Sequence, residues 1–114
     1  MKTADRRNRR NKERCLARLY DFYNRKYFGG KLPRLTMRWD EGAVDSELAS
    51  TIFMDDCPVM INFMAKGMDT EKRIRRVLLH EMVHVSLPPG VRHGKRWKVG
   101  MRRLAARGAL DEIW

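Results

Sequence analysis

Cysteine, histidine and long apolar runs are all scarce in this chain of 114 residues. The two cysteines, Cys15 and Cys57, lie in unrelated contexts with no C-x-x-C pairing. Neither a disulfide framework nor a cysteine-based zinc site is therefore predicted. No apolar stretch approaches the roughly 18 residues of a membrane span, and the basic N-terminus lacks the apolar segment of a secretory signal. We expect a soluble, intracellular protein with no membrane partner.

Low-complexity linkers and internal repeats are also missing, and 43% of the residues are hydrophobic. This composition favours one compact domain with its own core. We interpret residues 1–15 as a basic N-terminal extension that can begin the first helix, and residues 16–114 as the domain itself.

The spacing of the apolar residues predicts an α+β order. The predicted elements are a helix over residues 6–28, strands over residues 35–39, 50–54 and 59–63, a helix from Asp69 or Thr70 to about Leu87, and a helix from about Lys95 to Arg107. Gly29-Gly30 ends the first helix, and Gly108 suits the C-terminal cap of the last one. The three strands together predict a small sheet.

All three histidines fall between positions 80 and 93. On a helix, positions i and i+4 lie one above the other, so His80 and His84 can reach a single ion. Glu81 then lies about 100° round the helix, close enough to take a proton from a metal-activated water without being a ligand. This is the H-E-x-x-H pattern of zinc peptidases.

The residues around this motif favour a metal role over a solvated helix face. Ile74, Val77 and Leu78 lie beside the histidine pair, while Leu79 and Val83 cover much of the opposite side. A helix that is apolar almost all round is a core helix, and ionisable groups on it need partners. Metal ligation supplies such a partner.

Catalytic zinc usually takes three protein ligands and leaves a fourth position for water. His93 is the candidate for the third ligand, because Pro88-Pro89-Gly90 must end the helix and can turn the chain back towards the metal. A downstream carboxylate, Asp111 or Glu112, is the alternative. The predicted cofactor is Zn²⁺, with His80, His84 and His93 as ligands and Glu81 as the general base.

Two separated motifs resemble the SprT-like family. The segment from Leu19 to Pro33 resembles the opening of SprT-like domains, in which a helix ends in an asparagine, an aromatic pair and a leucine-proline step. His80-Glu81-Met82-Val83-His84, followed by His93-Gly94 and an aromatic at Trp97, resembles the metal motif of that family. The resemblance covers residues 16–104.

This resemblance implies a minimal zincin-type metalloprotease fold: an N-terminal helix, a three-stranded sheet, an active-site helix and a C-terminal helix. Eukaryotic members cleave proteins crosslinked to DNA and are stimulated by DNA. Many members carry a cysteine-rich zinc ribbon that these 114 residues do not include. We therefore expect targeting to come from the domain itself or from a partner.

The net charge of +11 would concentrate polyanions around the protein. Residues 1–18 contain eight bases against two acids, residues 88–107 contain seven bases and no acid, and residues 40–65 contain six acids and no base. Lys95, Arg96, Arg102 and Arg103 follow directly after the predicted third ligand. Such residues give salt-sensitive contacts to phosphates that do not depend on sequence. We predict binding to single- or double-stranded DNA, although arginine-rich helices can also be merely solvated.

The sequence therefore favours a zinc-dependent metallopeptidase that acts on protein substrates and is associated with DNA, in the cytoplasm or at the nucleoid. The main alternative is a small basic DNA-binding module whose zinc is structural or vestigial. A structural site would be closed by four protein ligands, and only three are evident, which favours catalysis. A zinc hydrolase acting on something other than peptides is a third alternative.

Overall fold

The computed structural model describes residues 3–41, 48–68, 70–90 and 93–111. Its elements in chain order are α1 (Thr3–Tyr27), β1 (Thr36–Asp40), β2 (Ala49–Met54), β3 (Cys57–Met64), the short 3₁₀ helix η1 (Ala65–Gly67), α2 (Glu71–Val85) and α3 (Lys95–Ala106). The predicted α+β class, with three helices and a three-stranded sheet, is confirmed. No described helix is both long and apolar enough to cross a membrane.

The sheet has the strand order β1-β3-β2, with β1 parallel and β2 antiparallel to β3. Asp55 and Asp56 connect β2 to β3 and have φ angles of 50° and 63°. Two consecutive residues with positive φ form the tight hairpin turn that matches the twist of the strands. Because this turn needs only two residues, β3 begins at Cys57, two positions earlier than predicted.

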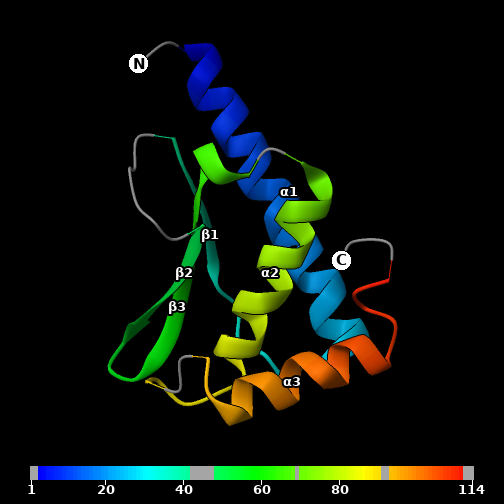
Figure 1. Cartoon of the computed structure of the whole chain (residues 1–114). Coiled ribbons are helices and arrows are strands. Elements are labelled where there is room, and N and C mark those ends of the chain that lie inside the picture. The colour runs from blue at the N-terminus through cyan, green and yellow to red at the C-terminus, as the bar shows by residue number, and fades with distance from the viewer. Residues whose placement is uncertain (1–2, 42–47, 69, 91–92, 112–114) are drawn as a thin grey trace.

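Helices α1 and α2 lie on one face of the sheet (Figure 1). On β1, Met37 and Trp39 are buried while Thr36 and Arg38 are exposed, as the alternating pattern predicted. Helix α2 is a core helix, because it contributes four of the seven largest side chains that are fully buried among the described residues. These four are Leu78, Leu79, Met82 and Val83.

Helix α1 begins at Thr3, so residues 3–15 of the basic extension are its first half. At its other end, the helix fixes the loop that leads into β1. The Asn24 amide donates to the Leu32 carbonyl at 3.0 Å and accepts from the Leu32 N–H at 3.1 Å. The Tyr20 hydroxyl donates to the Pro33 carbonyl at 2.6 Å. These bonds satisfy backbone groups that no strand pairs, which explains an asparagine and a leucine-proline step in this segment.

The ends of α2 follow local capping rules. Thr70 is the N-cap and its hydroxyl accepts from the Arg73 N–H at 3.1 Å. The helix ends at Val85, two residues earlier than predicted, and the Ser86 hydroxyl donates back to the Val83 carbonyl at 2.6 Å. Asp69, the other predicted cap, lies outside the described residues.

Helix α3 crosses beneath the lower ends of α1 and α2 (Figure 1). Its approach to α2 depends on Gly100, where an added Cβ would lie 2.6 Å from Cγ1 of Val83. At its far end, the Arg107 guanidinium donates to the carbonyls of Tyr27 and Lys26, both at 2.8 Å, and so caps α1. These contacts set the position of α3 relative to the histidine-bearing α2.

We expect Gly100→Ala to lower the free energy of unfolding by about 1–3 kcal/mol, because a valine is stiff at χ1 and cannot turn its methyl aside freely. Chemical denaturation measures the change. Gly100→Ala combined with Val83→Ala is the control, since the shortened side chain makes room for the new methyl. If the two changes simply add, the close contact does not limit packing there.

Candidate active site

A cleft of about 760 Å³ lies between the edge strand β2, helix α2 and the segment after α2. Thr51 of β2 lines it, together with His80, Glu81 and His84 of α2. His93, which lies between α2 and α3 in the chain, also lines it. All four residues predicted from the H-E-x-x-H pattern and its third histidine therefore line one hollow. Asp111, the alternative third ligand, does not line this cleft, and Glu112 lies outside the described residues.

The rings of His84 and His93 meet across this cleft. Their Nε2 atoms are 3.3 Å apart and the ring centroids 4.9 Å apart, at an interplanar angle of 72°. Zinc bound tetrahedrally by two imidazoles at about 2.0–2.1 Å needs ligand nitrogens about 3.3–3.4 Å from each other. The pair therefore fits two adjacent corners of a tetrahedral zinc site.

His80 lies one turn before His84, and its Nε2 atom is buried. Burial, followed by the neighbouring His93, lowers the pKa of His80 to about 4. Burial, followed by His93, also lowers the pKa of His84. Both imidazoles are therefore neutral near pH 7, which is the form that binds a metal.

The complete three-histidine site stays a prediction. Among the residues that the structure describes, no group of three or more histidine, cysteine, aspartate or glutamate side chains is arranged to hold a metal ion. The observed pair is His84 with His93, and ligation by His80 goes beyond it.

A family model identified as SprT-like matches residues 16–112, which is most of the chain. The chain belongs to the SprT-like family. It is also 34% identical over 105 residues to human germ cell nuclear acidic protein. That alignment covers 83% of this chain but 15% of the relative, so the chain spans a small part of the relative's length. No solved structure gave a significant match.

The ring of Trp97 packs against the rings of all three histidines of this SprT-like domain. Its ring centroid lies 5.2 Å from that of His80, 5.8 Å from that of His84 and 4.6 Å from that of His93. Its indole N–H also donates to the His80 carbonyl at 3.3 Å. In the sequence Trp97 is only an aromatic residue that follows His93-Gly94, and the fold alone shows that it packs against all three imidazoles.

Thr51 is a second residue that the sequence did not single out. Its hydroxyl donates to Glu81 Oε1 at 3.0 Å. Thr51 stands opposite Ile61 in the antiparallel pair, and because opposed residues share a face, its side chain lies on the helix-covered side. A threonine in a strand carries no sequence signal for such a contact with the carboxylate of Glu81.

The four cations predicted to contact DNA are not equivalent in the fold. Lys95, Arg96 and Arg103 line a hollow of about 500 Å³ that shares Pro88 with the cleft lined by the three histidines. Arg102 lines neither of these two hollows. The structure thus places three of the four at one surface next to the candidate site.

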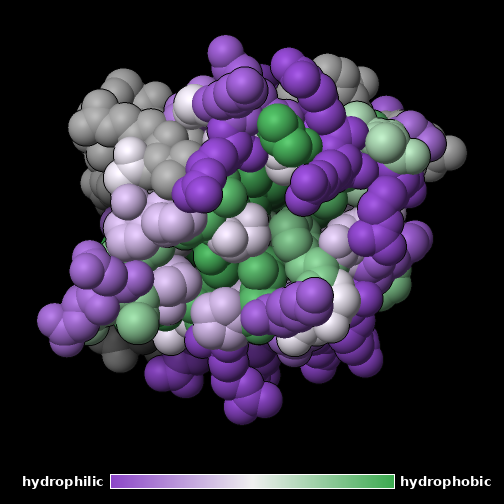
Figure 2. Space-filling model, turned by 90° about the horizontal axis from the view of Figure 1, so that it is seen from below, coloured by the Kyte–Doolittle hydropathy of each residue, from purple (hydrophilic) through white to green (hydrophobic). Residues whose placement is uncertain are grey.

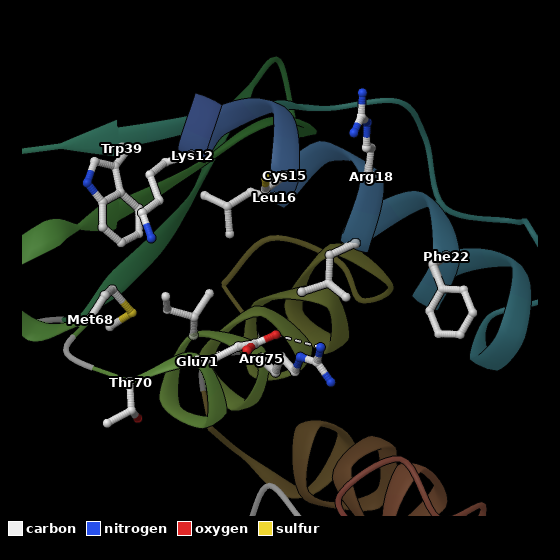
Figure 3. Close-up of a pocket in the computed structure, with 12 residues that line it drawn as sticks. Lys12, Cys15, Leu16, Arg18, Phe22, Trp39, Met68, Thr70, Glu71 and Arg75 are labelled. Carbon is white, nitrogen blue, oxygen red and sulfur yellow. Dashed lines mark hydrogen bonds and ion pairs between the residues drawn. The ribbon is translucent and has the colours of Figure 1, made fainter. Parts of the chain in front are cut away.

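A further hollow of about 610 Å³ lies between α1 and the start of α2 (Figure 3). It shares no lining residue with the cleft that the three histidines line. Within it, Arg75 pairs with Glu71 at 2.6 Å, and the Lys12 ammonium lies 5.6 Å from the centroid of the Trp39 ring. All three histidines of the chain line the other cleft instead.

Proposed function

We propose that this SprT-like domain is a zinc-dependent metallopeptidase that hydrolyses peptide bonds in protein substrates in association with DNA. The approach of His84 to His93, with Glu81 in the same cleft, is the observation that carries the proposal. The family in general comprises zincin-type metallopeptidases, which supports the same chemistry. His80, His84 and His93 are the proposed ligands.

In this proposal each residue of the cleft has a separate task. Zinc, when bound, supplies Lewis acidity that makes water acidic near neutral pH and polarises a carbonyl group. Glu81 is the general base that takes up the proton of the attacking water, and it can later deliver a proton to the leaving amine. Thr51 holds the Glu81 carboxylate through its hydroxyl, and Trp97 restrains the imidazoles by packing and by its bond to the His80 carbonyl.

Strand β2 is the proposed docking edge for the substrate. It is an outer strand of the sheet among the described residues, and Ala49, Ser50 and Thr51 line the cleft. An extended peptide can add to such an edge through main-chain hydrogen bonds, which select little for side chains. Selection of substrates by location would then matter more than selection by sequence.

Association with DNA is supported by charge and by the relative. The net charge is +11, and Lys95, Arg96 and Arg103 gather beside the cleft. The name of the human relative places that protein in the nucleus. We propose that DNA brings the peptidase to its protein substrates.

A second candidate is a basic DNA-binding domain without peptidase activity. It is favoured by one observation: the described residues show no complete group of three metal-binding side chains. In this second candidate the basic residues still contact DNA, but Glu81 has no catalytic role.

One assay separates the two candidates. Zinc content and cleavage of a labelled unfolded protein are measured in the parent protein, after chelation and after zinc is restored, with and without DNA. We expect about one zinc per chain, loss of cleavage on chelation and recovery on zinc addition. Zinc-independent cleavage, or bound zinc with no cleavage under any of these conditions, contradicts the proposed metallopeptidase.

A further inference from the structure

Two adjoining hollows follow helix α3. The larger, of about 690 Å³, lies among the C-terminal part of α1, the end of α2 and α3, and the smaller is the hollow of about 500 Å³ beside the cleft. Ser86, Leu87, Arg96, Val99 and Arg103 line both. We call this joint surface the α3 groove.

The charged residues of the α3 groove are all cations. Lys31, Arg96, Arg103 and Arg107 line the larger hollow, Lys95 joins them in the smaller one, and no acidic residue lines either. All five are exposed. Within the described part of the chain, no ion pair joins Arg96 or Arg103 to a carboxylate. The α3 groove is therefore complementary to a polyanion.

The floor of the α3 groove is apolar. Leu87 and Val99 line it half-buried, with Phe28 at the α1 end, and the buried side chains of Val83 and Leu104 lie beneath them. Figure 2, which views the molecule from below, shows apolar surface in the middle of this face with hydrophilic side chains around it. A ligand for this surface must offer phosphate-like anions at its edges and flat or apolar groups towards its middle.

The hollow in Figure 3 does not have these properties. Glu71 places a carboxylate in its lining, and Arg75 is paired with that carboxylate. Lys12 lies over the Trp39 ring, and Arg18 points away from the hollow (Figure 3). The α3 groove is thus the better candidate for binding a polyanion.

We propose that the α3 groove binds single-stranded nucleic acid. The phosphates would contact Arg96, Arg103 and Lys31, and the bases would cover the apolar floor. A duplex keeps its base faces stacked inside and can offer only phosphates and groove edges, whereas a single strand can present base faces to an apolar surface. This proposal deepens the DNA association of the proposed function and rests on it for its biological role.

The α3 groove adjoins the proposed peptidase site. Pro88 lines both the smaller hollow and the catalytic cleft. A strand that follows the α3 groove therefore leads to the rim of the cleft, where His84 and His93 meet. A protein attached to that strand would be held next to the peptidase site.

The test measures binding of a labelled oligothymidylate of about 12 nucleotides by fluorescence anisotropy at several salt concentrations. All variants carry Glu81→Gln, so that binding is read without proteolysis. We expect Arg103→Ala to weaken binding about fivefold, and Arg96→Ala with Arg103→Ala to weaken it more than about twentyfold and reduce the salt slope by about 1.4.

Arg102→Ala is the matched control, since Arg102 is the exposed neighbour of Arg103 and does not line the α3 groove. It should change the affinity by less than about twofold. Equal losses from Arg102→Ala and Arg103→Ala would overturn the proposal, as would equal binding of a duplex of the same length. Equally tight binding of polyglutamate would also overturn it and indicate an acidic peptide instead.

Failure of this proposal is separable from failure of the peptidase proposal. Oligonucleotide binding does not require catalysis, so its absence beside zinc-dependent cleavage would refute the α3 groove alone. Binding that depends on Arg103 in a protein without peptidase activity would support the α3 groove alone.

Discussion

Glutamine in place of Glu81 is expected to lower kcat for protein cleavage by about 10²- to 10⁴-fold, which is the usual contribution of a general base. The shape of the side chain is kept, and its remaining carbonyl oxygen can still accept from Thr51, which now donates to Oε1 at 3.0 Å. Zinc affinity should stay within about threefold of the parent value, because Glu81 is not a proposed ligand. Steady-state kinetics with metal analysis of the same preparation checks both parts.

Substitutions of Thr51 test the role of the Glu81 carboxylate in smaller steps. Thr51→Val keeps the size of the side chain but removes the donor to Glu81, and we expect kcat to fall about ten- to hundredfold with KM little changed. Thr51→Ser should recover most of the loss, since it restores the hydroxyl. Cleavage at the parental rate by Glu81→Gln would show that this carboxylate is not the base, whatever Thr51 does.

Alanine in place of His93 is expected to weaken zinc binding by more than about 100-fold, since loss of a ligand should exceed the effect of losing a residue that only supports one. Cleavage should disappear with the metal. The fold should survive, because His93 is exposed and lies just before α3 begins. Zinc titration against a competing chelator measures the affinity, and circular dichroism checks the fold.

The comparison variants for this prediction are His84→Ala and Lys95→Ala. His84→Ala should have the same effect on zinc, because its Nε2 lies 3.3 Å from that of His93. Lys95→Ala alters an exposed residue two positions further on and should leave zinc binding unchanged. If His93→Ala binds zinc as tightly as the parent, His93 is not a ligand and Glu112, the other acidic residue predicted from the sequence, becomes the alternative to examine.

Helix periodicity predicted the placement of His80 and His84 well, because residues four apart on a helix share a face in any fold. The alternation of Met37 and Trp39 with polar neighbours likewise predicted β1 and its buried side. The ends of the elements were less predictable. Helix α2 stops at Val85 because Ser86 caps it, and β3 starts at Cys57 because two aspartates with positive φ complete the turn.

The meeting of His93 with His84 was predicted as a return of the chain after Pro88-Pro89-Gly90, yet its distance depends on how α3 packs. Gly100 allows α3 to approach Val83, and Arg107 joins the far end of α3 to the end of α1. Those contacts involve residues far apart in the chain. No local pattern reveals them, and they place Trp97 against all three imidazoles.

The amino-acid sequence by itself determined the α+β class, the core helix that bears His80, Glu81 and His84, and the excess of positive charge, because these follow from local periodicity and composition. Tertiary structure alone decided that Thr51 reaches Glu81, that Trp97 backs the histidines, and that Arg103 lines a groove which its neighbour Arg102 does not. Side chains from separate elements acquire such relations only when sheet register and helix packing fix their positions together.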